Sequence, residues 1–180
     1  AVAANFAAPL QRIAQAFERQ TGHKVVASAG STGSLYAQIR NGAPFDVLLA
    51  ADDQTPARLA AENAAVVGTQ FSYAIGKLVL WSAQATLVDA TGDILRTGHF
   101  EHLAIADPRL APYGAAAVQS LKALGVYDAL QAKLVTAQSI AQAHQFVRSG
   151  NAQLGFVALS QVQQDGHIAG SAWLVPPTLY

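Results

Sequence analysis

The chain has 180 residues, of which 52% are hydrophobic and 12% are charged, and its 11 basic and 11 acidic side chains cancel. A chain of this length buries about 70% of the surface that its unfolded form exposes, so we expect a compact soluble body with one core or two smaller lobes. The absence of cysteine excludes disulfides, thiol catalysis and cysteine-based metal sites. The zero net charge, without a run of Lys or Arg, argues against nucleic acid as a partner.

Insertion into a membrane is not expected from the hydropathy of the chain. Its longest apolar runs, such as Val47-Leu48-Leu49-Ala50-Ala51, are far shorter than the ~20 residues that a membrane-spanning helix needs. No leader with a charged and an apolar part is present, so we expect that a signal peptide is absent from this chain.

Short apolar runs with the character of strands recur from one end of the chain to the other. We expect strands at residues 1–4, 24–28, 45–50, 71–75, 77–82, 102–106, 134–137, 154–159 and 172–175. The run at 45–50 is among the firmest, because only Asp46 interrupts its apolar character and Gly42 and Pro44 mark the turn before it.

Helical patterns fill the gaps between these strands. Leu10, Ile13 and Phe17 recur at helical spacing and predict a helix from Phe6 to Thr21, which Gly22 ends. Further helices are expected before Asn41-Gly42, from Pro56 onward, around Val118 to Leu124, from Tyr127 to about Lys133, and from Ile140 to Gly150. Strands that alternate with helices indicate βαβ units and a largely parallel sheet.

A division into lobes must occur where strands cross over, because Pro and Gly do not cluster into a linker. The adjacent runs 71–75 and 77–82, joined at Gly76, are the best candidate, and Val175-Pro176-Pro177 is the next. We therefore assign residues 1–76 to a first lobe, residues 77–175 to a second lobe, and residues 176–180 to the start of a return to the first lobe.

Four strand-to-helix turns share a small, polar or Gly-containing composition. Each leaves the first backbone N–H groups of a helix available, which suits an anion. Any one turn alone is better explained as an ordinary helix cap, but the coincidence of four favours a binding site. In a parallel sheet such turns lie at the carboxyl ends of the strands, where ligands of open α/β folds bind. The turns are Ala4-Asn5-Phe6, Gly30-Ser31-Thr32-Gly33-Ser34, Pro112-Tyr113-Gly114 and Gln138-Ser139-Ile140.

The same turns contain no Lys, Arg or His, although Arg109 lies three residues before Pro112. An anion would therefore be held by helix dipoles and by N–H and O–H donors. Such a site suits a small, fully ionised oxyanion, and it suits a weak acid less well because little in it accepts a proton.

A set of segments in a fixed order covers nearly the whole chain: Asn5-Phe6, Ala29-Gly30-Ser31-Thr32-Gly33, Asn41-Gly42-Ala43-Pro44 with Ala50-Ala51-Asp52, Tyr73-Ala74-Ile75-Gly76-Lys77-Leu78-Val79-Leu80-Trp81, Ala111-Pro112-Tyr113-Gly114 and Leu154-Gly155-Phe156-Val157-Ala158-Leu159. Together they resemble the periplasmic molybdate-binding proteins of ABC transporters. The resemblance implies an α/β, two-lobed periplasmic-binding-protein fold of class II type, with mostly parallel sheets flanked by helices. Its lobes would close on a tetrahedral molybdate or tungstate dianion.

The resemblance also implies a ligand shell of backbone N–H groups and hydroxyls. Tyr113 and Ile140 would act through their main-chain N–H groups, and Ser31 would be a neighbour of the ligand. Some family members use a tyrosine hydroxyl where this chain has Ala158, and others use a hydroxyl residue where it has Ala4, which leaves Ala4 only its backbone. The oxyanion-binding residues would be Ala4, Asn5, Ser31, Thr32, Tyr113 and Ile140.

Further properties follow from the same resemblance. It implies a periplasmic monomer that binds molybdate or tungstate, delivers it to a membrane permease of an ABC transporter, and has no cofactor and no enzymatic activity. Molybdenum would be present only as an oxyanion, not as a metal cation. Family members usually continue after the equivalent of Tyr180 and return to the first lobe, so this chain is expected to lack the family's C-terminal segment.

Other features of the sequence bear on metal, phosphate-binding and catalytic sites. His99-Phe100-Glu101-His102 suggests a metal, but no third ligand is evident. Gly30-Ser31-Thr32-Gly33 lacks the Lys of a phosphate-binding loop, and no Gly-x-Ser-x-Gly elbow is present. Asp52-Asp53 most simply caps the helix at Pro56. An oxyanion-sensing domain of a regulator, or a hydrolase or metal-dependent enzyme, stays an alternative. Selectivity between molybdate and tungstate depends on the radius of the cavity, which the sequence does not give.

Overall fold

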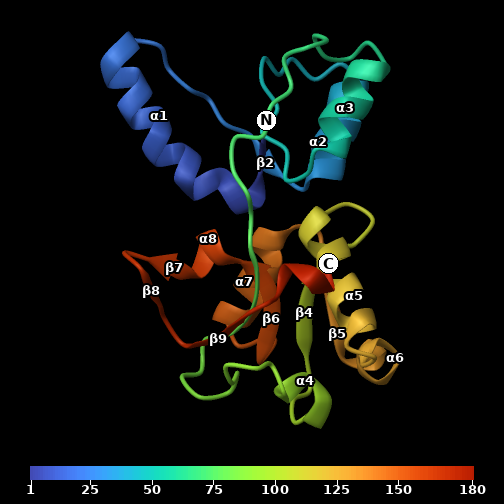
Figure 1. The fold of residues 1–180 in the computed structure, drawn as a ribbon. Coiled ribbons are helices and arrows are strands. Elements are labelled where there is room, and N and C mark those ends of the chain that lie inside the picture. Colours follow the sequence, from blue (N-terminus) through green and yellow to red (C-terminus); the bar gives the residue numbers. More distant parts are fainter. The chain divides into compact units, whose positions relative to one another are not determined.

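The computed structural model describes all 180 residues. It divides into two compact units, Ala1–Ile75 and Gly76–Tyr180 (Figure 1). The sequence analysis placed the corresponding boundary one residue later, after Gly76. No helix in either unit combines the length and the apolar character that crossing a membrane requires.

Unit 1 is built on very short parallel strands. β1 (Val2–Ala3) pairs with β2 (Ala29–Gly30) in parallel, with Val2 opposite Ala29 and Ala3 opposite Gly30. Leu49 adds an isolated parallel bridge to Val2. The strands lead into helical segments, which are η1 (Ala4–Phe6), α1 (Ala7–Thr21), α2 (Thr32–Arg40) and α3 (Gln54–Ala61).

Several strands that the sequence predicts in this unit do not form. Residues 24–28, 45–50 and 71–75 have no strand, apart from the bridge at Leu49, and each segment has at least one exposed large apolar side chain. Val26, Val47 and Phe71 are 84%, 62% and 76% exposed. β-branched and aromatic residues favour strands because they pack against neighbouring strands, and apart from the bridge at Leu49 these segments pair with no strand in unit 1.

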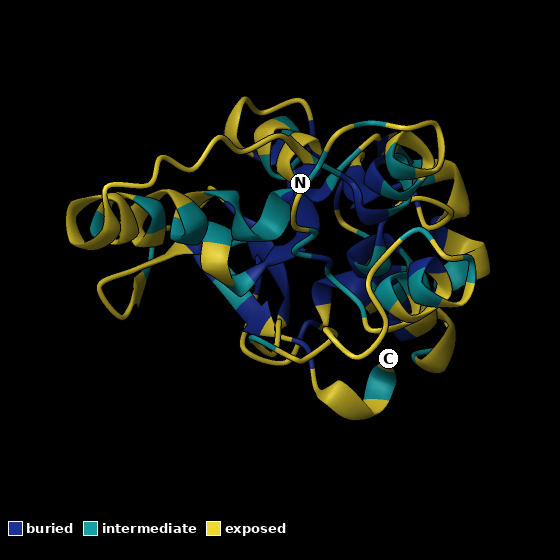
Figure 2. Ribbon diagram, turned by 90° about the horizontal axis from the view of Figure 1, so that it is seen from above, coloured by how far each residue is buried: buried dark blue, intermediate teal, exposed yellow.

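Helix α1 ends as predicted but does not pack as its pattern suggests. Gly22 has a φ of 73° and its N–H bonds to the Glu18 carbonyl, so the predicted glycine stop is confirmed. The helix has no buried residue, and Ile13 and Phe17 of its apolar stripe are 54% and 43% exposed (Figure 2). The core of unit 1 lies under α2 and α3 instead, where Leu35 and Leu59 are buried.

Unit 2 contains a five-stranded sheet in the order β5-β4-β6-β3-β9. β4 pairs in parallel with both β5 and β6, whereas β3 is antiparallel to β6 and to β9. The sheet is therefore mixed, and its parallel part is the part joined by helical crossovers. The strands are β3 (Leu78–Ser82), β4 (Leu103–Ala106), β5 (Leu134–Ala137), β6 (Leu154–Ala158) and β9 (Ser171–Leu174).

Two long helices connect the parallel strands. α5 (Pro112–Ala123) leads from β4 to the edge strand β5, and α7 (Ile140–Arg148) leads back from β5 to β6 (Figure 1). Because the two right-handed crossovers run in opposite directions along the sheet, they place α5 and α7 on opposite faces. The shorter elements are α4 (Ile94–Thr97), α6 (Tyr127–Leu130), η2 (Gln131–Lys133), α8 (Leu159–Val162), β7 (Gln163–Gln164), β8 (His167–Ile168) and η3 (Pro177–Leu179).

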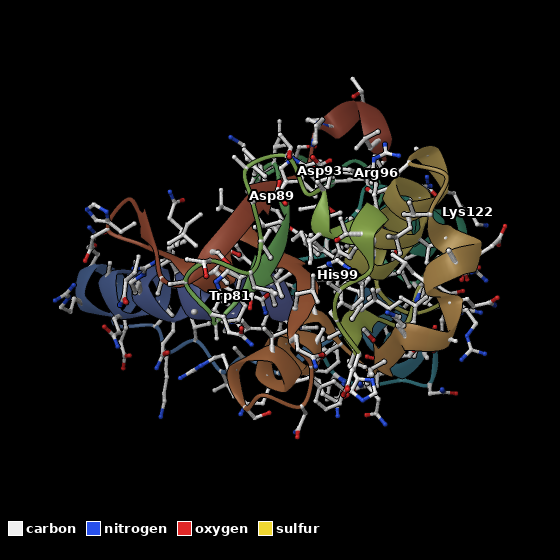
Figure 3. All side chains as sticks on the ribbon, turned by 90° about the horizontal axis from the view of Figure 1, so that it is seen from below. Trp81, Asp89, Asp93, Arg96, His99 and Lys122 are labelled. Atoms are coloured by element: carbon white, nitrogen blue, oxygen red, sulfur yellow. The ribbon has the colours of Figure 1, made fainter.

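The charged turn before α4 is organised by Asp89. Its carboxylate accepts hydrogen bonds from the hydroxyl and N–H of Thr91 and from the N–H groups of Asp93 and Ile94. These bonds, the Thr91 hydroxyl first, hold the pKa of Asp89 far below its ordinary value. Asp89, Asp93 and Arg96 lie close together in Figure 3. This turn precedes the amino end of β4, so it lies away from the edge where α5 and α7 begin.

The last residues of the chain lie with unit 2. The hydroxyl of Tyr180 accepts a hydrogen bond from Leu78 N–H at 3.3 Å, and Val175 N–H donates to the Leu78 carbonyl at 3.1 Å. η3 packs on α5. Residues 176–180, which the sequence analysis assigned to the start of a return to the first lobe, are thus held against β3 and α5 of the second unit.

Because the apolar stripe of α1 is exposed, shortening a side chain there should cost much less free energy of unfolding than shortening one in the core of unit 1. Ile13→Ala should change the free energy of unfolding by less than about 0.5 kcal/mol, as expected for an exposed site. Leu35→Ala, in the core of the same unit, should cost about 2 to 5 kcal/mol. Urea unfolding of the two variants checks this. Equal costs would show that the stripe of α1 is covered in the native molecule.

Candidate functional site

In unit 1, two of the predicted turns leave the same edge of the strand pair. Ala3 and Gly30 are opposite each other in β1 and β2, so the residues that follow them start side by side. Ala4 and Asn5 form the beginning of η1, and Ser31 and Thr32 form the beginning of α2. The structure thus brings together Ala4, Asn5, Ser31 and Thr32, which are the predicted site residues of this unit.

The hydroxyl of Thr32 is oriented by the backbone. Thr32 is 1% exposed, and its Oγ1 accepts a hydrogen bond from Ala51 N–H at 3.1 Å. A hydroxyl that accepts such a bond keeps its own hydrogen for donation, and its direction is then restricted. Ala51 follows Leu49, the residue that bridges to β1, so a third extended segment contributes to this edge. No local pattern indicates this contact, because Thr32 and Ala51 are 19 positions apart in the chain.

The hydroxyl of Ser31 forms its hydrogen bonds within the first turn of α2. Ser31 is the N-cap of α2, and its Oγ accepts from Ser34 N–H at 3.4 Å. Its own hydrogen goes to Ser34 Oγ at 2.9 Å, and Ser34 Oγ donates in turn to the Ser31 carbonyl at 2.8 Å. Ser31 therefore holds the first turn of α2 in place, and a contact of its side chain with a ligand stays a prediction.

In unit 2, the other two turns also begin at adjacent strand ends. Ala106 and Ala137, the last residues of β4 and β5, are opposite each other. The contact continues beyond them, because Asp107 N–H donates to the Ala137 carbonyl at 2.7 Å. The helices that follow, α5 and α7, therefore start at the same edge of the sheet.

The predicted donors of unit 2 are the first N–H groups of these helices. Tyr113 is the first residue of α5 that carries an N–H, because Pro112 precedes it. Ile140 is the first residue of α7, after the N-cap Ser139, whose hydroxyl accepts from Gln142 N–H at 3.3 Å. Both Tyr113 and Ile140 are buried. A helix beginning of this kind presents a partial positive charge to an anion.

The cation closest to the α5 turn in the sequence is paired. Arg109 donates from Nη2 to Asp107 Oδ2 at 2.7 Å and from Nε to Oδ1 at 3.1 Å. Its guanidinium side chain, followed by its backbone N–H, lowers the pKa of Asp107, which stays ionised. Since the two charges cancel, the beginning of α5 offers oriented donors without a spare charge of either sign.

Gln161 on α8 is a contact that the sequence analysis missed. Its Oε1 accepts from Ala158 N–H at 2.9 Å, and its Nε2 donates to the Ile140 carbonyl at 3.2 Å. One side chain thus ties the end of β6 to the first residue of α7. No local pattern indicates the bond to Ile140, because Gln161 and Ile140 are 21 positions apart in the chain.

His99 and His102 do not belong to a group of side chains that could hold a metal ion. No group of three or more His, Asp or Glu side chains is arranged to hold a metal ion. His102 N–H is bonded to Gln153 Oε1 at 2.8 Å, and His99 lies on the connection between α4 and β4 (Figure 3). Of the predicted caps, Asp52 accepts a hydrogen bond from Thr55 N–H at 2.8 Å, whereas the side chain of the N-cap residue Asp53 makes no capping bond, and α3 begins at Gln54, before Pro56.

The inner side of α7 carries a titratable ring against a tryptophan. The rings of His144 and Trp81 have centroids 5.1 Å apart, and Trp81 Nε1 donates to the Ala169 carbonyl. Burial, and to a smaller extent the charge of Arg148, lowers the pKa of His144. The folded protein therefore favours the neutral imidazole at this position.

Comparisons with known proteins find one matching family and several similar proteins. The family profile of bacterial extracellular solute-binding proteins matches residues 1–180. The molybdate-binding protein ModA of Azotobacter vinelandii is 60% identical over 181 residues, which cover 100% of this chain and 72% of that protein. ModA of Rhodobacter capsulatus is 52% identical, with 100% and 70% covered. The solved periplasmic molybdate-binding protein of A. vinelandii superposes with a TM-score of 0.96 at 48% identity, over 99% of this chain and 79% of that one.

The depressed pKa of His144 predicts an acid-side loss of stability. Because the unfolded chain binds the proton more readily than the folded one, stability falls as the pH drops below the ordinary histidine pKa of 6.5. Between about pH 7.5 and about pH 5, the melting temperature of His144→Gln should fall by less than that of the wild type. His167→Gln, at an exposed position of the same unit, is the control and should behave like the wild type. An identical acid-side loss in His144→Gln and the wild type would contradict this assignment.

Proposed function

Since this chain belongs to the bacterial extracellular solute-binding proteins and, within them, to the molybdate-binding proteins of ABC transporters, we propose that it captures molybdate with uncharged donors at the beginnings of its helices. The observation that supports this mechanism is the same in both units. Two helical segments in each unit follow residues that are opposite each other in parallel strands, Ala3 with Gly30 and Ala106 with Ala137.

The chemistry of such donors suits a dianion. N–H and O–H groups fixed by the fold replace the water around the oxyanion without having to reorient. Each hydrogen bond to a charged oxygen contributes about 1.5 to 3 kcal/mol when it is well oriented. Because Arg109 is neutralised by Asp107, attraction comes from peptide dipoles and hydroxyls, not from a titrating countercharge.

We propose that donors of both units take part. Ala4 contributes only its backbone, Asn5 its amide, and Thr32 the hydroxyl that Ala51 orients. Tyr113 and Ile140 contribute their main-chain N–H groups, and Ser31 is a neighbour of the ligand that fixes the first turn of α2. The proposed ligand shell consists of Ala4, Asn5, Ser31, Thr32, Tyr113 and Ile140.

The remaining properties are proposals of the same kind. The protein binds tungstate as well, acts as a monomer in the periplasm, and hands its ligand to a membrane permease. It needs no cofactor and catalyses no reaction, so molybdenum enters and leaves as the intact oxyanion. The solved A. vinelandii relative is described as periplasmic, which supports the proposed location.

Thr32 offers the most selective test of this mechanism. Thr32→Val keeps the shape of the side chain but removes the donor, so the dissociation constant for molybdate should rise about 10- to 100-fold. Thr32→Ser, which keeps the hydroxyl, should bind nearly as well as the wild type. Isothermal titration calorimetry measures both.

Thr69→Val is the matched control, because the Thr69 hydroxyl bonds only to the Val66 carbonyl at an exposed turn. Melting temperatures without ligand show whether each variant is folded. A folded Thr32→Val protein with wild-type affinity would refute the proposed role of the hydroxyl.

A further inference from the structure

Gly76 lies against the phenol of Tyr113. A Cβ atom at residue 76 would be 2.1 Å from the Tyr113 hydroxyl oxygen, which is too close for a real side chain, and 3.0 Å from Cζ, which is a tight contact. Gly76 is not among the glycines with positive φ, so its backbone conformation is open to other residues. The glycine is therefore required for space, and the group that occupies this space is the Tyr113 side chain.

Tyr113 has little freedom to move away from a side chain at residue 76. It is 9% exposed and lies in the first turn of α5. The next residue, Gly114, packs directly on β4, since a Cβ there would be 2.2 Å from the Ala106 carbonyl oxygen. The first turn of α5 is thus fixed between the end of β4 and the segment at Gly76. Displacing the phenol must tilt this turn or change the rotamer of a buried ring, and both are costly.

We propose that Gly76 is a positioning residue for oxyanion binding, which acts by seating the Tyr113 side chain so that the Tyr113 N–H keeps its direction. This inference rests on the proposed role of that N–H in the ligand shell. Gly76 is also the first residue of unit 2, directly after Ile75, and it precedes β3. The residue that begins the second unit therefore sets the geometry of the α5 donor.

The test compares variants of the intact chain in molybdate titrations, at a temperature well below their melting points. Gly76→Ala should raise the dissociation constant about tenfold or more, because hydrogen bonds to charged groups depend steeply on geometry. Tyr113→Phe keeps the main-chain N–H and removes the clashing oxygen. Combined with Gly76→Ala, it should recover most of the affinity that Gly76→Ala loses.

Gly166→Ala separates this effect from a general loss of stability. Gly166 lies in the same unit at a φ of 84° with no atom near its Cβ position, so alanine there strains the backbone without touching Tyr113. It should lower the melting temperature and leave the dissociation constant unchanged. A positioning role of Gly76 predicts that Gly76→Ala mainly raises the dissociation constant for molybdate and has a smaller effect on the melting temperature.

Two results would overturn the inference while the proposed function stands. One is that the wild type binds molybdate and Gly76→Ala binds it with the same dissociation constant. The other is a double variant as weak as Gly76→Ala alone. If Gly76→Ala does not fold, the Tyr113→Phe background must restore folding, and failure to do so overturns the inference too. A wild-type protein that does not bind molybdate contradicts the proposed function itself.

Discussion

Parallel pairing of neighbouring strand ends is the constraint on which the proposed binding mechanism depends. In unit 1 it sets Ala3 opposite Gly30, and in unit 2 it sets Ala106 opposite Ala137. Each of these four residues is followed by a turn into a helical segment, so the register of two backbone ladders decides where the donors start. Peptide dipoles placed in this way are fixed before the ligand arrives, and an anion gains their interaction without the cost of orienting them.

A second set of contacts fixes the direction of these donors. Ala51 N–H orients the Thr32 hydroxyl, and Gln161 holds the carbonyl of Ile140. The space left by Gly76 accommodates the Tyr113 phenol. Each contact joins residues far apart in the sequence, and each acts on a residue of the proposed ligand shell. The affinity of such a protein should therefore respond to residues that never touch the oxyanion.

Local signals in the sequence were sufficient for the longer helices and for the composition of the turns, but not for the short helices α4 and α8. The glycine stop at Gly22 and the cap at Ser139 depend on residues within one helical turn, so they could be predicted. The strand predicted at 45–50 failed because strand formation depends on neighbours, and unit 1 supplies only a bridge at Leu49. The reach of Gln161 to Ile140 and the space at Gly76 are properties of tertiary packing, which no local pattern records.

In the proposed mechanism, uncharged and non-titrating donors hold the dianion. Calorimetry of molybdate binding in several buffers at one pH, above the ordinary titration range of histidine, tests it directly, because any proton taken up or released adds the ionisation enthalpy of the buffer. With such donors, the binding enthalpy should be the same in every buffer, because no net proton is exchanged. An enthalpy that varies with the buffer in proportion to about one proton per molybdate would contradict it.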